Sequence, residues 1–154
     1  MQEDARVLRF FNNQALSLFH KAEFAGCLRR LWARLTGRPF LLDDLDACIR
    51  RSEIAGQHHA GLKSVPISRI RGTQGKAGEF DADFHPMQER SRARWVNIAL
   101  HRLRGHDLPP VELIQVNDTY YVRDGHHRIS VSRSLGQTYV DAQVTMMYLK
   151  SRVS

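Results

Sequence analysis

The stretch that most constrains the fold runs from Tyr120 to Gly136 and reads YYVRDGHHRISVSRSLG. Its aromatic and β-branched start, residues 120–122, favours a strand, and Asp124-Gly125 is a turn signal. The apolar spacing that follows favours a short helix, and Gly136 stands where the C-terminal cap of a helix belongs. The stretch therefore predicts a strand that continues through a polar turn directly into a helix.

Such a turn presents the positive end of a helix dipole together with the first backbone N–H groups of the helix. Gly125 allows a ligand or another chain to approach the backbone closely. Arg128 adds a fork of donors that matches a phosphate group. These features predict an anion site, with phosphate as the anion. The alternative interpretation is an ordinary turn followed by a solvated arginine.

The segment Asp124-Gly125-His126-His127-Arg128, between a strand and a short helix, resembles the G-x-x-R phosphate motif of the ParB/sulfiredoxin superfamily. Residues 65–70 resemble the opening strand of that family, and residues 108–114 resemble the strand that begins its hairpin. The resemblance covers roughly residues 62–150. It implies a small α+β domain, in which helices pack against a mixed sheet.

The resemblance also implies roles for the motif residues. Gly125, His126 and His127 would hold nucleotide phosphates through backbone N–H groups, and Arg128 would neutralise their charge. Asp124 would hold the turn or touch the substrate. Members of the superfamily bind or hydrolyse nucleotides, reduce sulfinic acids, phosphorylate free serine or bind DNA. The Asp-Gly-His-His-Arg form is most similar to the free serine kinase branch.

Two branches of the superfamily fit this sequence poorly. Sulfiredoxins carry a cysteine at the position of His126, and neither Cys27 nor Cys48 lies near the motif in the sequence. Chromosome-partitioning ParB proteins carry a helix-turn-helix domain after this one, whereas the given sequence ends at Ser154. We therefore expect neither sulfinic acid reduction nor partitioning in the strict sense.

Composition limits the class of protein and of partner. The sequence has 154 residues, of which 42% are apolar, so it can form a domain of about 100 residues with an appendage. The net charge of +7 favours a nucleotide, nucleic acid or an anionic membrane surface as partner, although solvated arginines give the same charge. No apolar run reaches the roughly 18 residues of a membrane span. With no signal peptide and no closely spaced cysteines, we expect a cytoplasmic protein.

The first 57 residues are expected to form a helical hairpin. Apolar residues recur at spacings of three and four and predict a helix over residues 1–37, followed by a second helix over about 43–51. The hairpin would cover a face of the next domain or form a homodimer. The alternative is a basic amphipathic helix that lies on a membrane or on nucleic acid.

Residues 52–64 are expected to be a loop, with 58–64 as the linker to a domain over residues 65–150. Adjacent histidines, His58 and His59, stand in this segment. No cysteine or carboxylate follows them at the spacing of zinc ligands, so the loop does not predict a metal site.

A glycine-rich loop containing Lys76, a further phosphate-binding candidate, precedes Glu79, Asp81 and Asp83. Alternate positions of an extended segment share one side, so these three carboxylates are candidate Mg²⁺ ligands, with waters and nucleotide phosphates completing the shell. Glu79 or Asp81 is the candidate general base, and Glu79 is the nearest match to the catalytic carboxylate of the free serine kinase. His127 is a candidate proton donor to phosphate. The alternative is a solvated acidic loop.

A helix is predicted over residues 86–104, and its buried stripe is Val96, Ala99, Leu100 and Leu103. The opposite side carries a basic stripe, namely Arg90, Arg94, His101 and Arg104. This stripe would contact phosphates or a nucleic-acid backbone if it borders the pocket; otherwise it is a solvent face. A hairpin of strands at 111–116 and 119–122 follows, and a last strand is predicted over residues 139–147.

The sequence thus supports three hypotheses. The first is a nucleotide-binding enzyme for ATP, ADP or CTP with Mg²⁺, which transfers or hydrolyses phosphate. The second is a nucleotide-binding switch that dimerises through residues 1–57. The third is a basic nucleic-acid-binding or ParB-like nuclease module without nucleotide turnover, with Arg90, Arg94 and Arg104 on phosphates.

Overall fold

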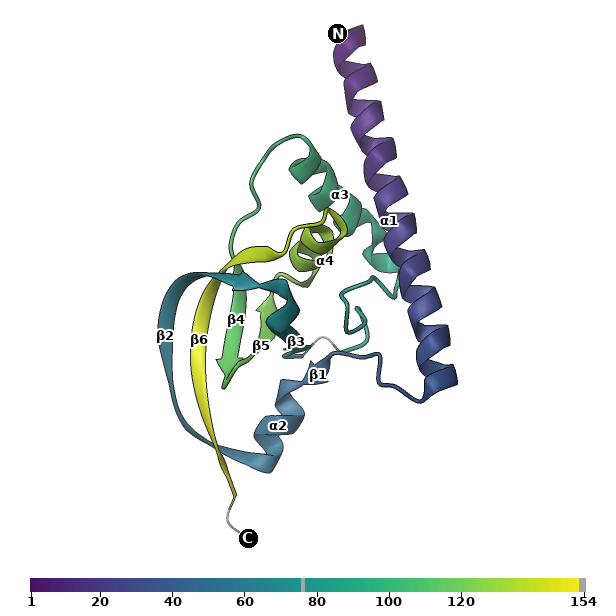
Figure 1. The fold of residues 1–154 in the computed structure, drawn as a ribbon. Coiled ribbons are helices and arrows are strands. Elements are labelled where there is room, and N and C mark those ends of the chain that lie inside the picture. Colours follow the sequence, from purple (N-terminus) through teal and green to yellow (C-terminus); the bar gives the residue numbers. More distant parts are fainter. Residues whose placement is uncertain (76, 153–154) are drawn as a thin grey trace.

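The computed structural model describes residues 1–75 and 77–152 (Figure 1). In chain order the elements are α1 (Gln2–Thr36), β1 (Asp43–Asp44), α2 (Leu45–Arg51), β2 (Ser52–Pro66), the 3-10 turn η1 (Ile67–Arg69), β3 (Ile70–Thr73), the 3-10 turn η2 (Glu89–Ser91), α3 (Arg92–Leu103), β4 (Val111–Val116), β5 (Thr119–Asp124), α4 (His126–Ser134) and β6 (Tyr139–Ser151). Within the described residues no helix is both long and apolar enough to cross a membrane.

In the described part of the chain, six strands form one mixed sheet in the order β1-β3-β5-β4-β6-β2. β3 pairs in parallel with β1 and β5, and β4 pairs in parallel with β6. β4 and β5 form an antiparallel hairpin whose turn contains Asn117 with a φ of 54°, a conformation that Asn tolerates. The predicted hairpin, the last strand and the α+β class are confirmed.

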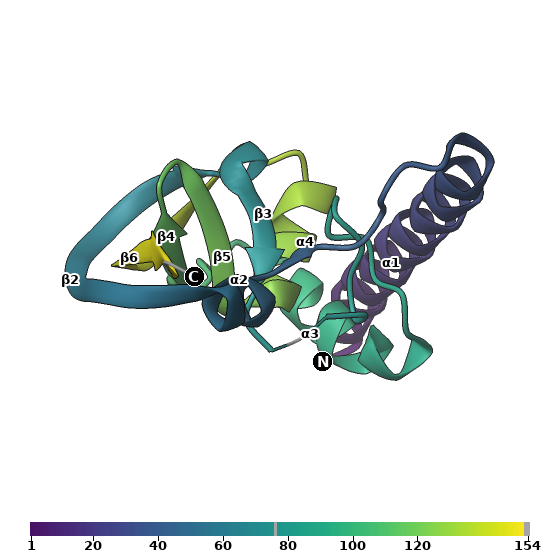
Figure 2. The same cartoon turned by 90° about the horizontal axis from the view of Figure 1, so that it is seen from below.

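The sheet separates two apolar clusters. Leu113 and Val122 belong to the larger cluster, between the sheet and the helices α1, α3 and α4. Their neighbours Ile114 and Tyr121 belong to the second cluster, together with Leu45 of α2. Successive side chains of a strand point to opposite faces, so α2 covers the face opposite to α3 and α4. Figure 2 shows α3 and α4 between the strands and α1.

Helix α1 packs on this body through a stripe of small residues and one phenylalanine: Ala15, Phe19, Ala22, Gly26 and Ala33. Phe19 contacts Trp95 of α3 edge to face, with ring centroids 5.5 Å apart. The N-terminal turns of α1 project beyond the rest of the molecule (Figure 1). The helix predicted over residues 1–37 is confirmed, and it runs unbroken through Asn12 and Asn13.

The two predicted N-terminal helices are present, but they do not pack as the expected hairpin. Between them, β1 pairs with the sheet edge through Asp43 and Asp44, opposite Gly72 and Thr73. Leu45 is fully buried at the start of α2 and packs in the second cluster. The apolar side of α2 is therefore used by the sheet rather than by α1.

Residues 52–64, predicted as a loop that includes the linker 58–64, form most of strand β2. This strand pairs along its length with β6, from Ser52 opposite Ser151 to Pro66 opposite Tyr139. Most of its side chains are exposed, and Val65 is its buried member. Backbone hydrogen bonds rather than a buried face hold this strand, so it lacks the apolar alternation that sequence patterns detect.

Two further boundaries differ from the prediction. The strand expected at 65–70 is divided, because β2 ends at Pro66 and β3 begins at Ile70 after the turn η1. The helix expected over 86–104 begins later, because Pro86 forms an isolated bridge with Phe80 and α3 starts at Arg92. The buried stripe of α3 includes Trp95, which the sequence interpretation omitted.

Candidate phosphate-binding site

The predicted strand, turn and helix at residues 120–136 are confirmed as β5, Gly125 and α4. Gly125 caps α4 with a φ of 108° and a ψ of 20°. A Cβ at this position would lie 2.5 Å from Val111 Cγ1 and 3.2 Å from Arg128 Nη2. The turn therefore requires glycine at position 125 for two reasons, namely its left-handed backbone and its close approach to β4. It places the positive end of the α4 dipole beside the start of β4.

The side chains of His126 and His127 point into the protein beneath this turn. Both are buried. His126 Nε2 and Thr73 Oγ1 are 2.6 Å apart in a hydrogen bond that ties α4 to β3. The ring of Phe80 stacks on His126 with centroids 6.2 Å apart, and it meets His127 edge to face at 5.0 Å. The segment containing Phe80 therefore lies against the first turn of α4.

Arg128 is tied to the protein by three hydrogen bonds. Its Nη1 donates to the carbonyl oxygens of Pro109 at 3.0 Å and Pro110 at 2.7 Å. Its Nη2 donates to Asp124 Oδ2 at 3.0 Å. Since a guanidinium has five N–H donors, these bonds fix its orientation without using the whole fork. Arg128 thereby connects α4 to the entry of β4, and Asp124 partly balances its charge.

Arg128 also borders a hollow between α3 and α4. The hollow has a volume of about 620 Å³ and is lined by Arg94, Asn97, Ile98, His101, Leu108, Pro109 and Arg128. We call it the α3–α4 hollow. It brings two members of the predicted basic stripe, Arg94 and His101, together with the arginine of the motif. Its lining contains no carboxylate, and Ile98, Leu108 and Pro109 give it an apolar part.

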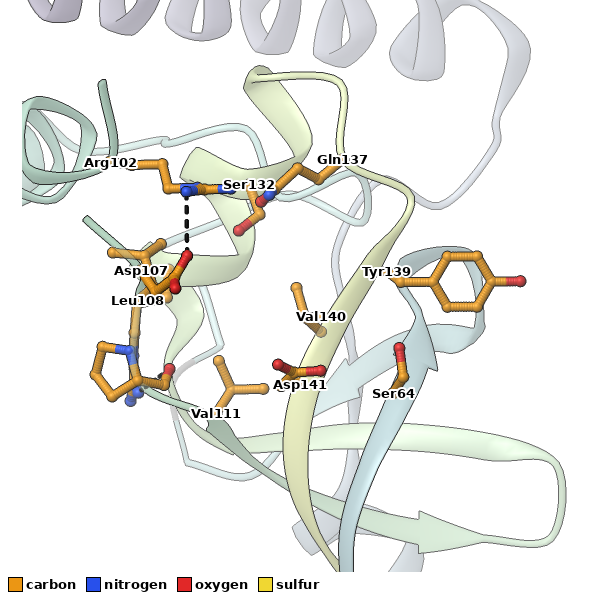
Figure 3. Close-up of a pocket in the computed structure, with 12 residues that line it drawn as sticks. Ser64, Arg102, Asp107, Leu108, Val111, Ser132, Gln137, Tyr139, Val140 and Asp141 are labelled. Atoms are coloured by element: carbon orange, nitrogen blue, oxygen red, sulfur yellow. Dashed lines mark hydrogen bonds and ion pairs between the residues drawn. The ribbon is translucent and has the colours of Figure 1, made fainter. Parts of the chain in front are cut away.

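A second hollow, of about 300 Å³, lies on the other side of Leu108 and Pro109 and also includes Arg128 in its lining. Figure 3 shows Arg102 bonded to Asp107 at one wall and Asp141 at the other. The two carboxylates offset the two arginines, so this hollow is less suited to a phosphate than the α3–α4 hollow is.

The acidic segment has a different shape from the one predicted. Residues 81–85 form a turn rather than an extended strand, and Asp81 Oδ1 accepts from the backbone N–H groups of Asp83 and His85, each at 2.9 Å. Asp81 Oδ2 is also bonded to His85 Nδ1 at 2.9 Å. Asp81 is fully buried, and its carboxylate is occupied in holding this turn.

The other two carboxylates have partners of their own. Asp83 forms ion pairs with Arg29 of α1 and with Arg133 of α4, the latter at 3.0 Å. Glu79 lies 3.9 Å from Arg90 and is about one quarter exposed. Over residues 1–75 and 77–152, no group of three His, Cys, Asp or Glu side chains is placed to hold a metal ion. The premise that three alternating carboxylates share one side therefore fails.

The remaining candidates divide between the site and the surface. Arg90, Arg94 and Arg104 are all exposed, and Arg94 is the one of the three that lines the α3–α4 hollow. Lys76 lies outside the described residues. Cys27 lies on α1, and Cys48 lies on α2 beside Tyr121 of β5.

The sequence interpretation missed several residues of this region. Asn97 lies between Arg94 and His101 at helical spacing, and this i, i+3, i+7 pattern would have identified it. Leu108 and Pro109 fall in the segment 108–114 that resembles a strand of the superfamily, whereas they lie before β4 and line both hollows. Thr73 and Phe80 contact the motif histidines from sequence positions about 50 residues away, and no local pattern points to them.

Comparison with known proteins gives one match of structure. No family model matches this chain, and no curated protein matches it in sequence. A crystal structure of sulfiredoxin from Arabidopsis thaliana is similar to it. The similarity covers 54% of this chain and 82% of that chain, at 20% identity and a TM-score of 0.34.

Proposed function

We propose that this protein binds a nucleotide, with its phosphates in the α3–α4 hollow. The observation that carries the proposal is the convergence of Arg94, His101 and Arg128, from two helices, on one hollow without a carboxylate in its lining. Arginine pairs with phosphate through charge and through paired N–H donors. The first turn of α4 adds the positive end of a helix dipole.

The shape of the hollow favours a nucleotide over inorganic phosphate. Ile98, Leu108 and Pro109 provide apolar surface in the same hollow, and a base or a sugar can bury its rings there. ATP, ADP and CTP are the candidate ligands. Mg²⁺ would arrive on the nucleotide phosphates and keep its waters, because the lining of the hollow offers it no carboxylate.

The proposal extends to phosphotransfer or hydrolysis with Glu79 as the general base. Of the three acidic candidates, Asp81 is occupied by its turn and Asp83 by two arginines. Glu79 retains a partly exposed carboxylate, and its neighbour Phe80 packs on the motif histidines. His127 would contribute through its backbone N–H rather than its ring, since its side chain is buried beneath the turn.

Calorimetry with ATP, ADP, CTP and GTP in the presence of Mg²⁺ tests the proposal. Arg94→Ala is the sharpest variant, because Arg94 is exposed and no ion pair within the described residues involves it. Loss of one charge-assisted hydrogen bond of about 1.5–3 kcal/mol should raise the Kd about 10- to 150-fold. Arg51→Ala, an exposed arginine of α2, is the matched control and should leave the Kd unchanged.

Arg128 needs a milder substitution. Arg128→Ala also removes the bonds to Pro109, Pro110 and Asp124, so lost binding in that variant has two explanations. Arg128→Lys keeps the positive charge and loses the paired N–H donors of the guanidinium. It should weaken nucleotide binding less than Arg94→Ala if those donors bond mainly to Pro109, Pro110 and Asp124. Failure of the native protein to bind any of the four nucleotides overturns the proposal.

Turnover is tested separately from binding. Glu79→Gln should retain nucleotide affinity and lose phosphate release or transfer, because the amide cannot accept a proton. Equal turnover by the native protein and the Gln variant would exclude Glu79 as the base. Binding without turnover by the native protein would leave the nucleotide-binding switch.

A nucleic-acid ligand is the second candidate, and the exposed side of α3 favours it. Arg94 is exposed on α3, Arg90 on the preceding turn η2 and Arg104 at the C-terminal cap of α3, on a chain with a net charge of +7. Such a stripe should bind a DNA or RNA backbone with an affinity that falls steeply with salt. Arg104→Ala separates the candidates, because Arg104 does not line the α3–α4 hollow. It should weaken nucleic-acid binding and spare nucleotide binding.

A further inference from the structure

Helix α1 has a second apolar side that no part of the described chain covers. On the side opposite its buried stripe stand Val7, Phe10, Phe24, Leu28, Leu31 and Leu35, each at least 51% exposed. We call this set the α1 stripe. Trp32 flanks it, 53% exposed, with the Arg38 guanidinium 5.1 Å from its ring centroid. Six large apolar side chains along one helix are more than scattered surface hydrophobics, so they mark an interaction surface.

The spacing of the α1 stripe is that of a coiled-coil seam. Its members follow intervals of three and four residues, from Val7 to Phe10 and from Phe24 through Leu28 and Leu31 to Leu35. The seam positions between the two groups are Gln14, Ser17 and Lys21. Alternation of four and three keeps one face toward a partner helix. The occupant that matches this seam is therefore another long helix, and the chain itself supplies one.

The charges of α1 favour an antiparallel partner. Its first turn carries Glu3 and Asp4, and its last turn carries Arg34, with Arg38 just beyond. Two antiparallel copies bring the acidic first turn of each helix toward the basic last turn of the other, and their dipoles also oppose. A parallel pair would instead place Lys21 on the partner's Lys21 and join the two basic ends.

We propose that the protein forms a homodimer through an antiparallel pair of α1 helices. In the favoured register Phe10 faces the partner's Leu28 and Val7 faces the partner's Leu31. The polar middle then places Ser17 opposite the partner's Lys21. Because the α1 stripe lies opposite the buried stripe, the two bodies fall on opposite sides of the helix pair. The interface is isologous, with each contact made twice.

Mass in solution gives the first test. Light scattering should find twice the 17.7 kDa of one chain for the native protein and a single chain for Leu28→Glu. Leu28 is exposed in the monomer, so this variant should keep its circular dichroism and its nucleotide affinity. Asn12→Glu, exposed on α1 outside the stripe, is the control and should remain dimeric. A native protein that is monomeric at the highest concentration reached overturns the proposal.

Cysteine cross-linking tests the orientation. In a background of Cys27→Ser and Cys48→Ala, Val7→Cys and Leu31→Cys are made as separate variants. An antiparallel pair separates the two copies of residue 7 by about 36 Å, since an α-helix rises about 1.5 Å per residue. Neither variant alone should then form a disulfide-linked dimer, and a mixture of the two should. Linkage of either variant alone contradicts the antiparallel arrangement.

A lipid surface is the competing occupant, since α1 also carries several arginines. Vesicles of phosphatidylglycerol and phosphatidylcholine separate the two cases. One outcome is that the native protein is monomeric and co-sediments with the vesicles, and that Leu28→Glu abolishes this co-sedimentation. This outcome would assign the α1 stripe to membranes and overturn the homodimer. A native protein that is dimeric and stays in the supernatant supports the homodimer.

Discussion

Gly125 and Val111 lie in direct contact, and a side chain at position 125 would overlap the valine, with its Cβ 2.5 Å from Val111 Cγ1. The left-handed φ of 108° adds a backbone penalty for any other residue. This contact joins the α4 turn to β4 and sets where the helix dipole points. It also fixes the start of the helix that carries Arg128, which lines the α3–α4 hollow.

Gly125→Ala should lower the free energy of unfolding by about 2–4 kcal/mol, from the left-handed backbone and the overlap with β4 together. Urea unfolding followed by tryptophan fluorescence measures the loss. Val111→Ala in the same chain relieves the overlap and leaves only the free-energy cost of the left-handed backbone at position 125. The double variant should therefore lose less than the sum of the two single variants. Additive losses would show that the contact with Val111 contributes nothing.

Asp81 should act as a structural residue of the 81–85 turn. Asp81→Ala leaves the backbone N–H groups of Asp83 and His85 without their acceptor, and should cost about 2–4 kcal/mol. Asp81→Asn keeps an acceptor oxygen and should cost less. Thermal unfolding of the native protein and the two variants measures the order of their stabilities. If instead Asp81→Asn retains full stability and loses nucleotide turnover, Asp81 is a catalytic group as the sequence interpretation proposed.

Ser130 should couple α3, α4 and the 81–85 turn in the core. Trp95 Nε1 donates to Ser130 Oγ at 2.8 Å, and Ser130 Oγ donates to the carbonyl oxygen of Phe84 at 2.5 Å. Ser130→Ala leaves two buried polar groups unsatisfied and should cost about 1–3 kcal/mol. Trp95→Phe removes one of those groups. A double-mutant cycle in chemical denaturation should therefore show coupling between the two sites, and zero coupling would mean the bond has no net energy.

Tyr121 should make stability fall at alkaline pH. Burial raises the pKa of Tyr121 above 10.0, and Cys48 and Asp43 raise it further. The unfolded chain then loses its phenolic proton first as pH rises through about 10, so this contribution is complete below pH 10 and is lost above it. Unfolding curves from pH 8 to 11 measure the decline. Tyr121→Phe cannot ionise at this position and should show a smaller decline over the same range.

The sequence predicted those elements of the fold that are determined by residues close together in the chain. The long helix α1, the β4–β5 hairpin and the β5–Gly125–α4 turn are set by neighbouring residues, namely apolar periodicity, Asn117 and Asp124-Gly125. All three were predicted. The strand β2 was missed because its partner β6 lies far along the chain, from Ser52 opposite Ser151 to Pro66 opposite Tyr139, and because its own side chains are mostly exposed. Pairing between distant segments leaves no mark in a local pattern.

The candidate site divides in the same way. The sequence by itself determined the motif turn and the shared side of Arg94 and His101 on α3, because helix phase and turn chemistry are properties of adjacent residues. Arg90, predicted in the same stripe, lies in the turn η2 before the helix. Only the tertiary structure decided that Arg94, His101 and Arg128 share one hollow, that Asp81 is occupied by its own turn, and that the motif histidines point inward onto Phe80. These outcomes follow from the packing of α3 and α4 on one face of the sheet, where side chains compete for the same partners and local preference no longer decides.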